Sequence, residues 1–301
     1  MPTVIWQCVG NWWGKRKGNP RCPAGLVRFP RIEETNHTAE ERTAVQKNFG
    51  EVTVSTFNPE TAQQAIEQLV WANRILANED IFDYLGHVSV RNPENPKTFF
   101  IARAIAPEAV TREDILEVDQ EGKVISKSEM KPYTERIIHG AIYKNRPEVN
   151  SVIHAHPIQV VTVSVSEIPF RVLSYQASVF YEGVPNYAGY DFTSPNSTGM
   201  LIQTKEEGDR VAATLGNSMA MMMWGHGCNV VGKSVPHAIQ NAIALRDNSA
   251  ILLGAQQHGK VKSLSYDEAK VSARVMAGLA GAERAWNVWV NRVKKVMPDM
   301  A

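Results

Sequence analysis

The amino-acid sequence predicts an α/β fold whose sheet is at least partly antiparallel. Short apolar segments lie between helical ones, and several are joined by hairpin-like turns. No Gly-x-Gly-x-x-Gly fingerprint follows a predicted strand and no Walker loop occurs, which disfavours a doubly wound nucleotide-binding fold. The 301 residues suffice for one large domain or two moderate ones.

Five segments are predicted to be helices. The first and the last carry apolar residues at helical spacing. Thr134 is expected to cap the second, which should end before Pro147. The segment 160–165 fits either a short helix or a strand. The predicted helices span 61–78, 134–145, 206–215, 236–253 and 266–296.

The predicted strands are short. The turn-forming run Asn92–Pro96 separates the first two, and Gln120–Gly122 is expected to close a hairpin between the third and the fourth. The strands are predicted at 88–91, 98–101, 115–118, 123–126, 151–156, 200–202 and 219–224.

Residues 1–57 differ in character from the remainder of the chain. Trp6, Trp12 and Trp13 stand among glycines and prolines, without a sustained helical or strand period. We therefore expect an irregular N-terminal arm over 1–57 and a catalytic domain with C-terminal helices over 58–301.

The composition disfavours several classes of function. The 32 Lys and Arg residues balance 31 Asp and Glu residues to a net charge of +1, which gives no global field for a nucleic-acid partner. Three widely spaced cysteines predict neither a disulfide framework nor a cysteine-based zinc site. No apolar run approaches the ~20 residues of a membrane helix, and residues 1–18 lack a signal-peptide pattern. We expect no membrane partner and a cytoplasmic location.

The strongest chemical signal is the pair His154 and His156. On a strand, residues two apart point to the same face, so both imidazoles project side by side. Such a pair can share a metal ion when neutral. His226 stands between two glycines after the predicted strand 219–224 and could complete a three-histidine site with open positions. His37, His237 and His258 are predicted to face water.

Glu135 and His139 lie four residues apart and therefore on one face of the predicted helix 134–145. The Glu135 carboxylate has two interpretations. It can interact with the helix dipole at the N-terminal turn, or it can lie beside the metal as an acid/base or a fourth ligand.

These motifs resemble the class II aldolase/adducin-type family. The resemblance extends over about residues 58–280 and rests on the segments 86–91, 134–139, 145–149, 154–157 and 225–227. It implies a three-layer α/β/α sandwich around a mainly antiparallel central sheet, with His154, His156 and His226 as metal ligands and Glu135 as the catalytic acid/base. It also implies a homotetramer with active sites at subunit interfaces.

Two departures bear on the substrate. Sugar-phosphate members of the family have Asn where this chain has His87, and a Ser/Thr-Gly pair where it has Arg103–Pro107. The loss of these phosphate-binding groups disfavours a phosphosugar. His87 with Arg103 resembles the branch that decarboxylates hydroxylated aromatic or pyridine dicarboxylates, since a guanidinium can hold a carboxylate bidentately. The competing interpretation of Arg103 is a surface ion pair. Ser89 is expected to help position the carboxylate.

The expected function is that of a divalent-metal-dependent carbon–carbon lyase. It would decarboxylate a hydroxylated aromatic or heteroaromatic carboxylate through a metal-stabilised enolate, and His87, Glu135 or His139 would deliver the proton. Zn²⁺, Mn²⁺ and Fe²⁺ all suit imidazole ligands. An aldolase acting on a non-phosphorylated hydroxy-carbonyl compound and a non-haem iron oxygenase remain alternatives. A catalytically inactive scaffold is disfavoured because all three ligand histidines are present.

Overall fold

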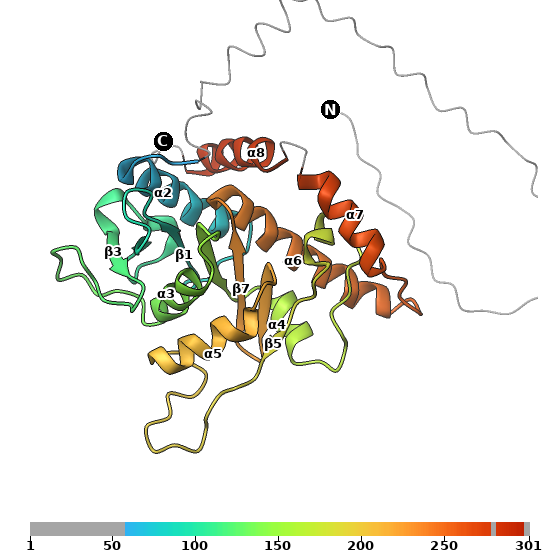
Figure 1. Cartoon of the computed structure of the whole chain (residues 1–301). Coiled ribbons are helices and arrows are strands. Elements are labelled where there is room, and N and C mark those ends of the chain that lie inside the picture. The colour runs from blue at the N-terminus through green and yellow to red at the C-terminus, as the bar shows by residue number, and fades with distance from the viewer. Residues whose placement is uncertain (1–57, 278–280, 298–301) are drawn as a thin grey trace, which may run out of the picture. The chain divides into compact units, whose positions relative to one another are not determined.

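A seven-stranded sheet forms the middle layer of the structure (Figure 1). The computed structural model describes residues 58–277 and 281–297, so the predicted arm and His37 lie outside the described residues. The strand order is β3-β2-β1-β4-β7-β6-β5, with all neighbours antiparallel except β5 and β6. The strands are β1 (His87–Arg91), β2 (Thr98–Ala102), β3 (Ile115–Asp119), β4 (Ser151–Ala155), β5 (Asn186–Tyr187), β6 (Ala220–Met223) and β7 (Gly227–Gly232).

Helices cover both faces of this sheet, which confirms the predicted sandwich. Helices α2, α4, α6 and α8 contribute to the apolar core on one face, and α3 and α5 pack together on the other. The helices are α2 (Ala62–Asn78), α3 (Arg136–Asn145), α4 (Ile158–Ser164), α5 (Lys205–Leu215), α6 (Val235–Gln256), α7 (Tyr266–Ala277) and α8 (Gly281–Val296). Short 3₁₀ turns are η2 (Pro107–Ala109), η3 (Arg112–Asp114) and η4 (Gln176–Phe180).

The alternation of side chains along the central strands separates the core from the polar residues. Val88 of β1, Ile153 of β4 and Val230 of β7 enter the core beneath α2 and α6. Because successive residues of a strand point to opposite faces, the neighbouring His87 and His154 lie on the face covered by α3 and α5. Polar side chains are thus gathered on one face of three adjacent strands.

Two predicted strands are not formed. The segment 123–126 is not a regular strand, but it folds back on β3 as a hairpin, with a bridge between Val118 and Val124 and a hydrogen bond from the Ile125 amide to the Glu117 carbonyl. The segment 200–202 is irregular, since the Ile202 amide donates to the Glu135 carboxylate instead of to a neighbouring strand.

Two helix predictions are refined. Residues 160–164 belong to helix α4, and Val165 is its C-cap residue. Helix α3 begins at Arg136 with Glu135 as its N-cap residue, so Thr134 is not the cap. Within the predicted helix 266–296, α7 and α8 are helical, and residues 278–280 lie outside the described residues.

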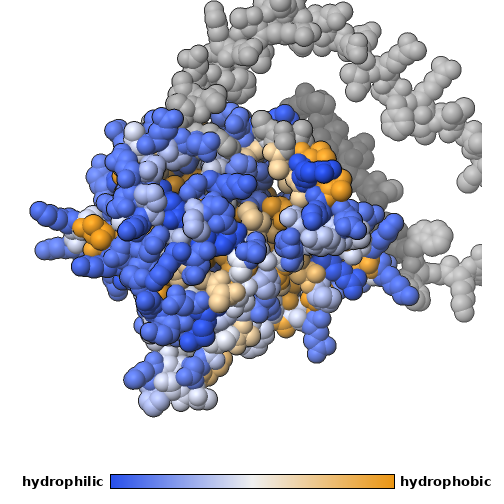
Figure 2. All heavy atoms as spheres, in the orientation of Figure 1, coloured by the Kyte–Doolittle hydropathy of each residue, from blue (hydrophilic) through white to orange (hydrophobic). Residues whose placement is uncertain are grey.

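Hydrophilic side chains cover most of the face drawn in Figure 2, and hydrophobic ones appear in smaller patches, among them patches around α4, α6 and α7 and on the loop after β3. Within the described residues, none of the helices has both the length and the apolar character needed to span a membrane.

Close packing at Gly140 allows α3 to approach the turn after β3, and this gives a test of the fold. A Cβ atom at Gly140 would lie 2.4 Å from the Gln120 carbonyl oxygen. We expect Gly140→Ala to destabilise the protein by about 1–3 kcal/mol, because backbone must move to relieve the clash. The matched control is Gly254→Ala on α6, where a Cβ meets nothing within 4 Å. There the higher helix propensity of alanine should stabilise by up to ~1 kcal/mol. Urea unfolding curves measure the free energy of unfolding of both variants. A Gly140→Ala variant more stable than the wild type would contradict the close packing of α3 against Gln120.

Candidate metal centre

The structure brings together the three histidines predicted as metal ligands. His154 lies near the end of β4, His156 follows that strand, and His226 occupies the turn between β6 and β7. One potential ligand atom from each lies within 4.8 Å of the others. The Nε2 atoms of His154 and His156 are only 3.0 Å apart.

Two glycines place His226 beside the end of β4. Gly225 has a φ of +64°, a conformation that a side chain would disfavour. A Cβ atom at Gly227 would lie 2.4 Å from the Ala155 carbonyl oxygen and 2.6 Å from Cδ2 of His156. The turn can therefore approach His156 only because both flanking residues lack side chains.

Second partners orient the two strand histidines. His154 Nδ1 lies 2.9 Å from the amide oxygen Oδ1 of Asn229, and His156 Nδ1 lies 3.1 Å from the carboxylate oxygen Oδ1 of Asp83. Since both oxygens are acceptors, each Nδ1 donates a proton and each Nε2 presents a lone pair. Two lone pairs at 3.0 Å repel unless a cation lies between them. The donor set and its outer partners therefore fit a divalent metal ion.

The Glu135 carboxylate faces this cluster. Its Oε2 lies 3.3 Å from His154 Nε2 and 3.7 Å from His226 Nε2, and its Oε1 accepts the Ile202 amide at 3.1 Å. The side chain makes no capping hydrogen bond to α3. Of the two interpretations of Glu135, the geometry favours a carboxylate beside the metal position.

The charges in the cluster are strongly coupled. Burial alone would raise the pKa of Glu135, but His154, His226 and the Ile202 amide outweigh burial and lower that pKa to about 2. Burial would lower the pKa of His154, but Glu135 and Asn229 raise it overall. Burial and the neighbouring His154 lower the pKa of His156. The same two causes lower the pKa of His226 to about 4. At pH values below the raised pKa of His154, the metal-free cluster therefore carries a proton on His154 opposite the Glu135 carboxylate.

His87 and His139 lie behind the three histidines. The His87 ring stacks on the His154 ring with centroids 5.0 Å apart, and His87 Nδ1 lies 2.8 Å from His139 Nε2. His139 is fully buried, and burial together with the nearby His154 lowers its pKa to about 3. His139 is therefore neutral and has no surface exposed to a substrate.

The two predicted substrate-binding residues lie in different surroundings. Ser89 is fully buried, and its hydroxyl contacts His139 and Tyr143, so the expectation that it positions a substrate does not fit its location. Arg103 is partly exposed, and its Nε donates to Asp114 at 2.6 Å. The loop after Arg103 is connected to the site, because Tyr133 donates to the Ile105 carbonyl and its ring lies 4.6 Å from His87.

The sequence-based reasoning missed four residues around the site. Asp83 and Asn229 orient ligand histidines, Tyr143 contacts Ser89, and the Tyr190 ring lies 6.4 Å from the His226 ring. The Tyr190 hydroxyl has no hydrogen-bond partner among residues 58–277 and 281–297. Asp83 lies four residues before His87, Asn229 lies two residues after Gly227, and Tyr143 lies four residues after His139, so these three stand near motifs that could have drawn attention to them. His258 is exposed as expected, whereas His237 is half-buried and bonded to Ser234.

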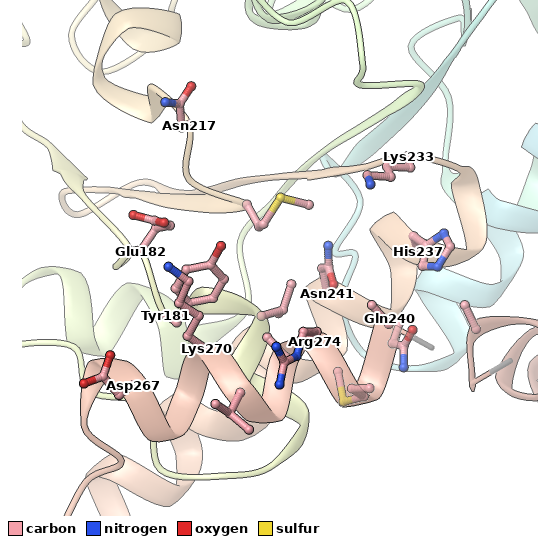
Figure 3. A pocket seen from close by; sticks show the side chains of 17 residues that line it. Tyr181, Glu182, Asn217, Lys233, His237, Gln240, Asn241, Asp267, Lys270 and Arg274 are labelled. Carbon is pink, nitrogen blue, oxygen red and sulfur yellow. The ribbon is translucent and has the colours of Figure 1, made fainter. Parts of the chain in front are cut away.

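A separate cavity of about 710 Å³ lies between α6, α7 and the residues after η4 (Figure 3). Its lining includes Lys233, which follows the end of β7, whereas His226 precedes the start of that strand. The cavity therefore lies at the opposite end of β7 from the histidine cluster and takes no part in that site.

Known proteins resemble this chain in overall sequence and in fold. The profile described as "Class II Aldolase and Adducin N-terminal domain" matches residues 67–253. Decarboxylase tropJ of Talaromyces stipitatus is 27% identical over 242 residues, covering 73% of this chain and 90% of that protein. A 3,4-dihydroxyphthalate decarboxylase of Arthrobacter keyseri is 25% identical over 248 residues, covering 79% and 97%. The structure of an L-fuculose 1-phosphate aldolase from Glaciozyma antarctica PI12 superposes with a TM-score of 0.67 at 24% identity, covering 83% and 99%.

Removal of one ligand should abolish tight metal binding. We expect the full-length protein to bind Zn²⁺ or Mn²⁺, and His156→Ala to weaken that binding by more than about 100-fold, because loss of outer partners alone costs about 10–100-fold. His258→Ala, which removes an exposed histidine, is the matched control and should bind as the wild type does. Isothermal titration calorimetry measures the metal affinity of the wild type and of both variants. Equal affinities of the wild type and His156→Ala would contradict the proposed metal site.

Metal binding should weaken as the pH falls. The raised pKa of His154 means that the metal-free cluster is protonated there at pH 6, and the ion must displace that proton. Below this pKa, each further pH unit should cost about tenfold in apparent affinity for one displaced proton, whereas above it the affinity should be nearly constant. Calorimetry in two buffers of different ionisation enthalpy counts the protons released. Release of none at pH 6 would show that His154 is neutral in the metal-free protein.

Proposed function

The chain belongs to the class II aldolase and adducin N-terminal domain family, and from this premise we propose that it decarboxylates a hydroxylated aromatic or heteroaromatic carboxylate. The proposal rests chiefly on one arrangement, in which His87 and Glu135 both lie against His154, a candidate metal ligand. The two decarboxylases that align with most of this chain support the same chemistry.

His154, His156 and His226 would hold the divalent ion, with Zn²⁺, Mn²⁺ and Fe²⁺ all compatible with three imidazoles. When bound, the ion would act as a Lewis acid on a substrate oxygen next to the carboxylate that is lost. Asn229 and Asp83 keep the Nε2 lone pairs of His154 and His156 directed at this position.

Glu135 is the proposed acid/base. With a pKa lowered to about 2, it is a carboxylate that can accept the proton of the substrate hydroxyl. Glu135 passes this proton to the ring carbon that bears the carboxylate. The bond between that carbon and the carboxylate then breaks, its electron pair enters the ring and places negative charge on the substrate oxygen, and CO₂ leaves. A proton from water restores the hydroxyl and leaves hydroxide. The Ile202 amide holds Oε1 in place while Oε2 performs these transfers.

Arg103 is the proposed partner of a substrate carboxylate. Asp114 accepts from its Nε, and within the described part of the chain the terminal nitrogens of the guanidinium remain available for a bidentate interaction. The hydrogen bond from Tyr133 to Ile105 fixes the Arg103 loop close to His87. A second carboxylate on the substrate would suit this position.

Exposed apolar side chains around the site support the proposal of a homotetramer. Tyr84 is 75% exposed, Ile158 is 70% exposed and Trp224 is 41% exposed. Each stands within two residues of a group in the cluster, namely Asp83, His156 and His226. A second copy of the chain that covers these side chains would also enclose the substrate.

The decisive experiment compares two products. The metal-loaded protein should release CO₂ from hydroxylated benzene or pyridine dicarboxylates. Glu135→Gln should reduce that rate by about 10²–10⁴-fold, because it removes the acid/base. Glu108→Gln, which alters an exposed glutamate, is the control and should keep the wild-type rate. Release of an aldehyde from hydroxy-carbonyl substrates, without CO₂, would identify an aldolase instead. Product formation that requires O₂ would identify an oxygenase.

A further inference from the structure

A chain of four buried polar side chains runs from α3 to the histidine cluster. The Tyr143 hydroxyl lies 2.8 Å from Ser89 Oγ, and Ser89 Oγ lies 2.7 Å from His139 Nδ1. His139 Nε2 then lies 2.8 Å from His87 Nδ1. All four side chains are at most 1% exposed, so bulk water does not interrupt the sequence of hydrogen bonds.

The hydroxyl of Tyr143 sets the direction of this chain. Burial raises the pKa of Tyr143 well above its usual value, so the phenol keeps its proton. The backbone amide of Val152 also approaches the phenol oxygen, but an amide N–H can only donate to it. Among residues 58–277 and 281–297, Ser89 Oγ is therefore the acceptor that the structure offers to the Tyr143 proton.

The remaining donors and acceptors follow in order. Ser89 accepts from Tyr143 and donates its own proton to His139 Nδ1. His139 then carries its proton on Nε2 and donates it to His87 Nδ1. The opposite order would bury the phenol proton without an acceptor, and an unsatisfied buried donor is disfavoured. A neutral His87 that accepts at Nδ1 must carry its proton on Nε2.

We propose that Tyr143, Ser89 and His139 hold His87 as a neutral imidazole protonated on Nε2, which donates a hydrogen bond to an anionic oxygen of the substrate beside the metal histidines. His87 is then neither a metal ligand nor a general base. Tyr143, Ser89 and His139 are positioning residues. This inference rests on the proposed function only for the identity of the acceptor, an oxygen of a hydroxylated carboxylate.

The packing around the chain supports this role. The two ring nitrogens of an imidazole point in different directions, so Nε2 of His87 is directed away from His139. One ring nitrogen of His87 lies within 4.8 Å of ligand atoms of Glu135 and His154. At the other end, the Arg91 guanidinium lies 4.6 Å over the Tyr143 ring and donates to the Tyr143 carbonyl. Both ends of the chain are therefore held in place.

The tautomer of His87 can be measured directly. Nitrogen-15 NMR of the metal-free, full-length protein with labelled histidine rings distinguishes the two neutral tautomers, and His87→Gln assigns the signals of His87. We expect the proton of His87 on Nε2. We also expect it to remain there after Zn²⁺ is added, while the signals of His154, His156 and His226 shift. A proton on Nδ1, or loss of the Nε2 proton on adding Zn²⁺, would overturn the proposal.

A matched pair of serine variants tests the positioning role. Ser89→Ala breaks the chain and should give a mixture of the two His87 tautomers. Ser151→Ala removes another fully buried hydroxyl, which donates only to the Ser89 carbonyl, and should leave a single tautomer. A single Nε2 tautomer in folded Ser89→Ala would refute the role of the chain. If that variant does not fold, the wild-type measurement decides.

These measurements use the resting protein and are independent of turnover. Failure to release CO₂ with a single Nε2 tautomer at His87 would contradict the proposed reaction and leave the tautomer established. A wrong tautomer in a protein that releases CO₂ would contradict only this inference.

Discussion

The organisation of the site depends on the repulsion between two imidazole lone pairs held 3.0 Å apart. Asn229 and Asp83 occupy the Nδ1 positions of His154 and His156, so neither histidine can rotate its lone pair away without losing a hydrogen bond. Glu135, which is almost fully buried, offers its charge to the same point. Each of these groups would be unfavourable alone, and together they define a position for one cation. Burial of Glu135 and the fixed orientation of the histidines both depend on that cation, whether a proton or a metal ion.

The register of the sheet aligns these groups. His87 pairs with His154 across β1 and β4, and His154 pairs with Asn229 across β4 and β7. A hydrogen-bond donor, a ligand and the partner of that ligand therefore form one row across three antiparallel strands. A shift of one residue in either pairing would move the row to the opposite face. The shift is disfavoured by the neighbouring apolar residues Val88, Ile153 and Val230. It would move their side chains out of the apolar core on the opposite face of the sheet.

Local patterns predicted the candidate ligands but not their hydrogen-bond partners. The spacing of His154 and His156 and the glycines around His226 are properties of short segments, and a strand period is enough to interpret them. Asn229 is 75 residues from His154, so its role depends on strand register, which one sequence does not reveal. The same limit applies to Glu135, whose helix-terminal position fits two interpretations until the surrounding histidines are located. Ser89 was assigned to the substrate from its motif, yet the pleat directs it towards α3.

The division between neutral and charged groups bears on the chemistry that this scaffold can support. Behind His154, the chain from Tyr143 to His87 is buried and uncharged, whereas Glu135 and the partly exposed Arg103 carry the fixed charges. A fixed donor such as His87 would stabilise negative charge that develops on a substrate oxygen without itself changing protonation. Proton transfer would then fall to Glu135 alone, which is the one carboxylate in contact with the candidate ligands His154 and His226 among the described residues. Separating the group that stabilises charge from the group that moves the proton suits a reaction in which charge appears on oxygen while the proton goes to carbon.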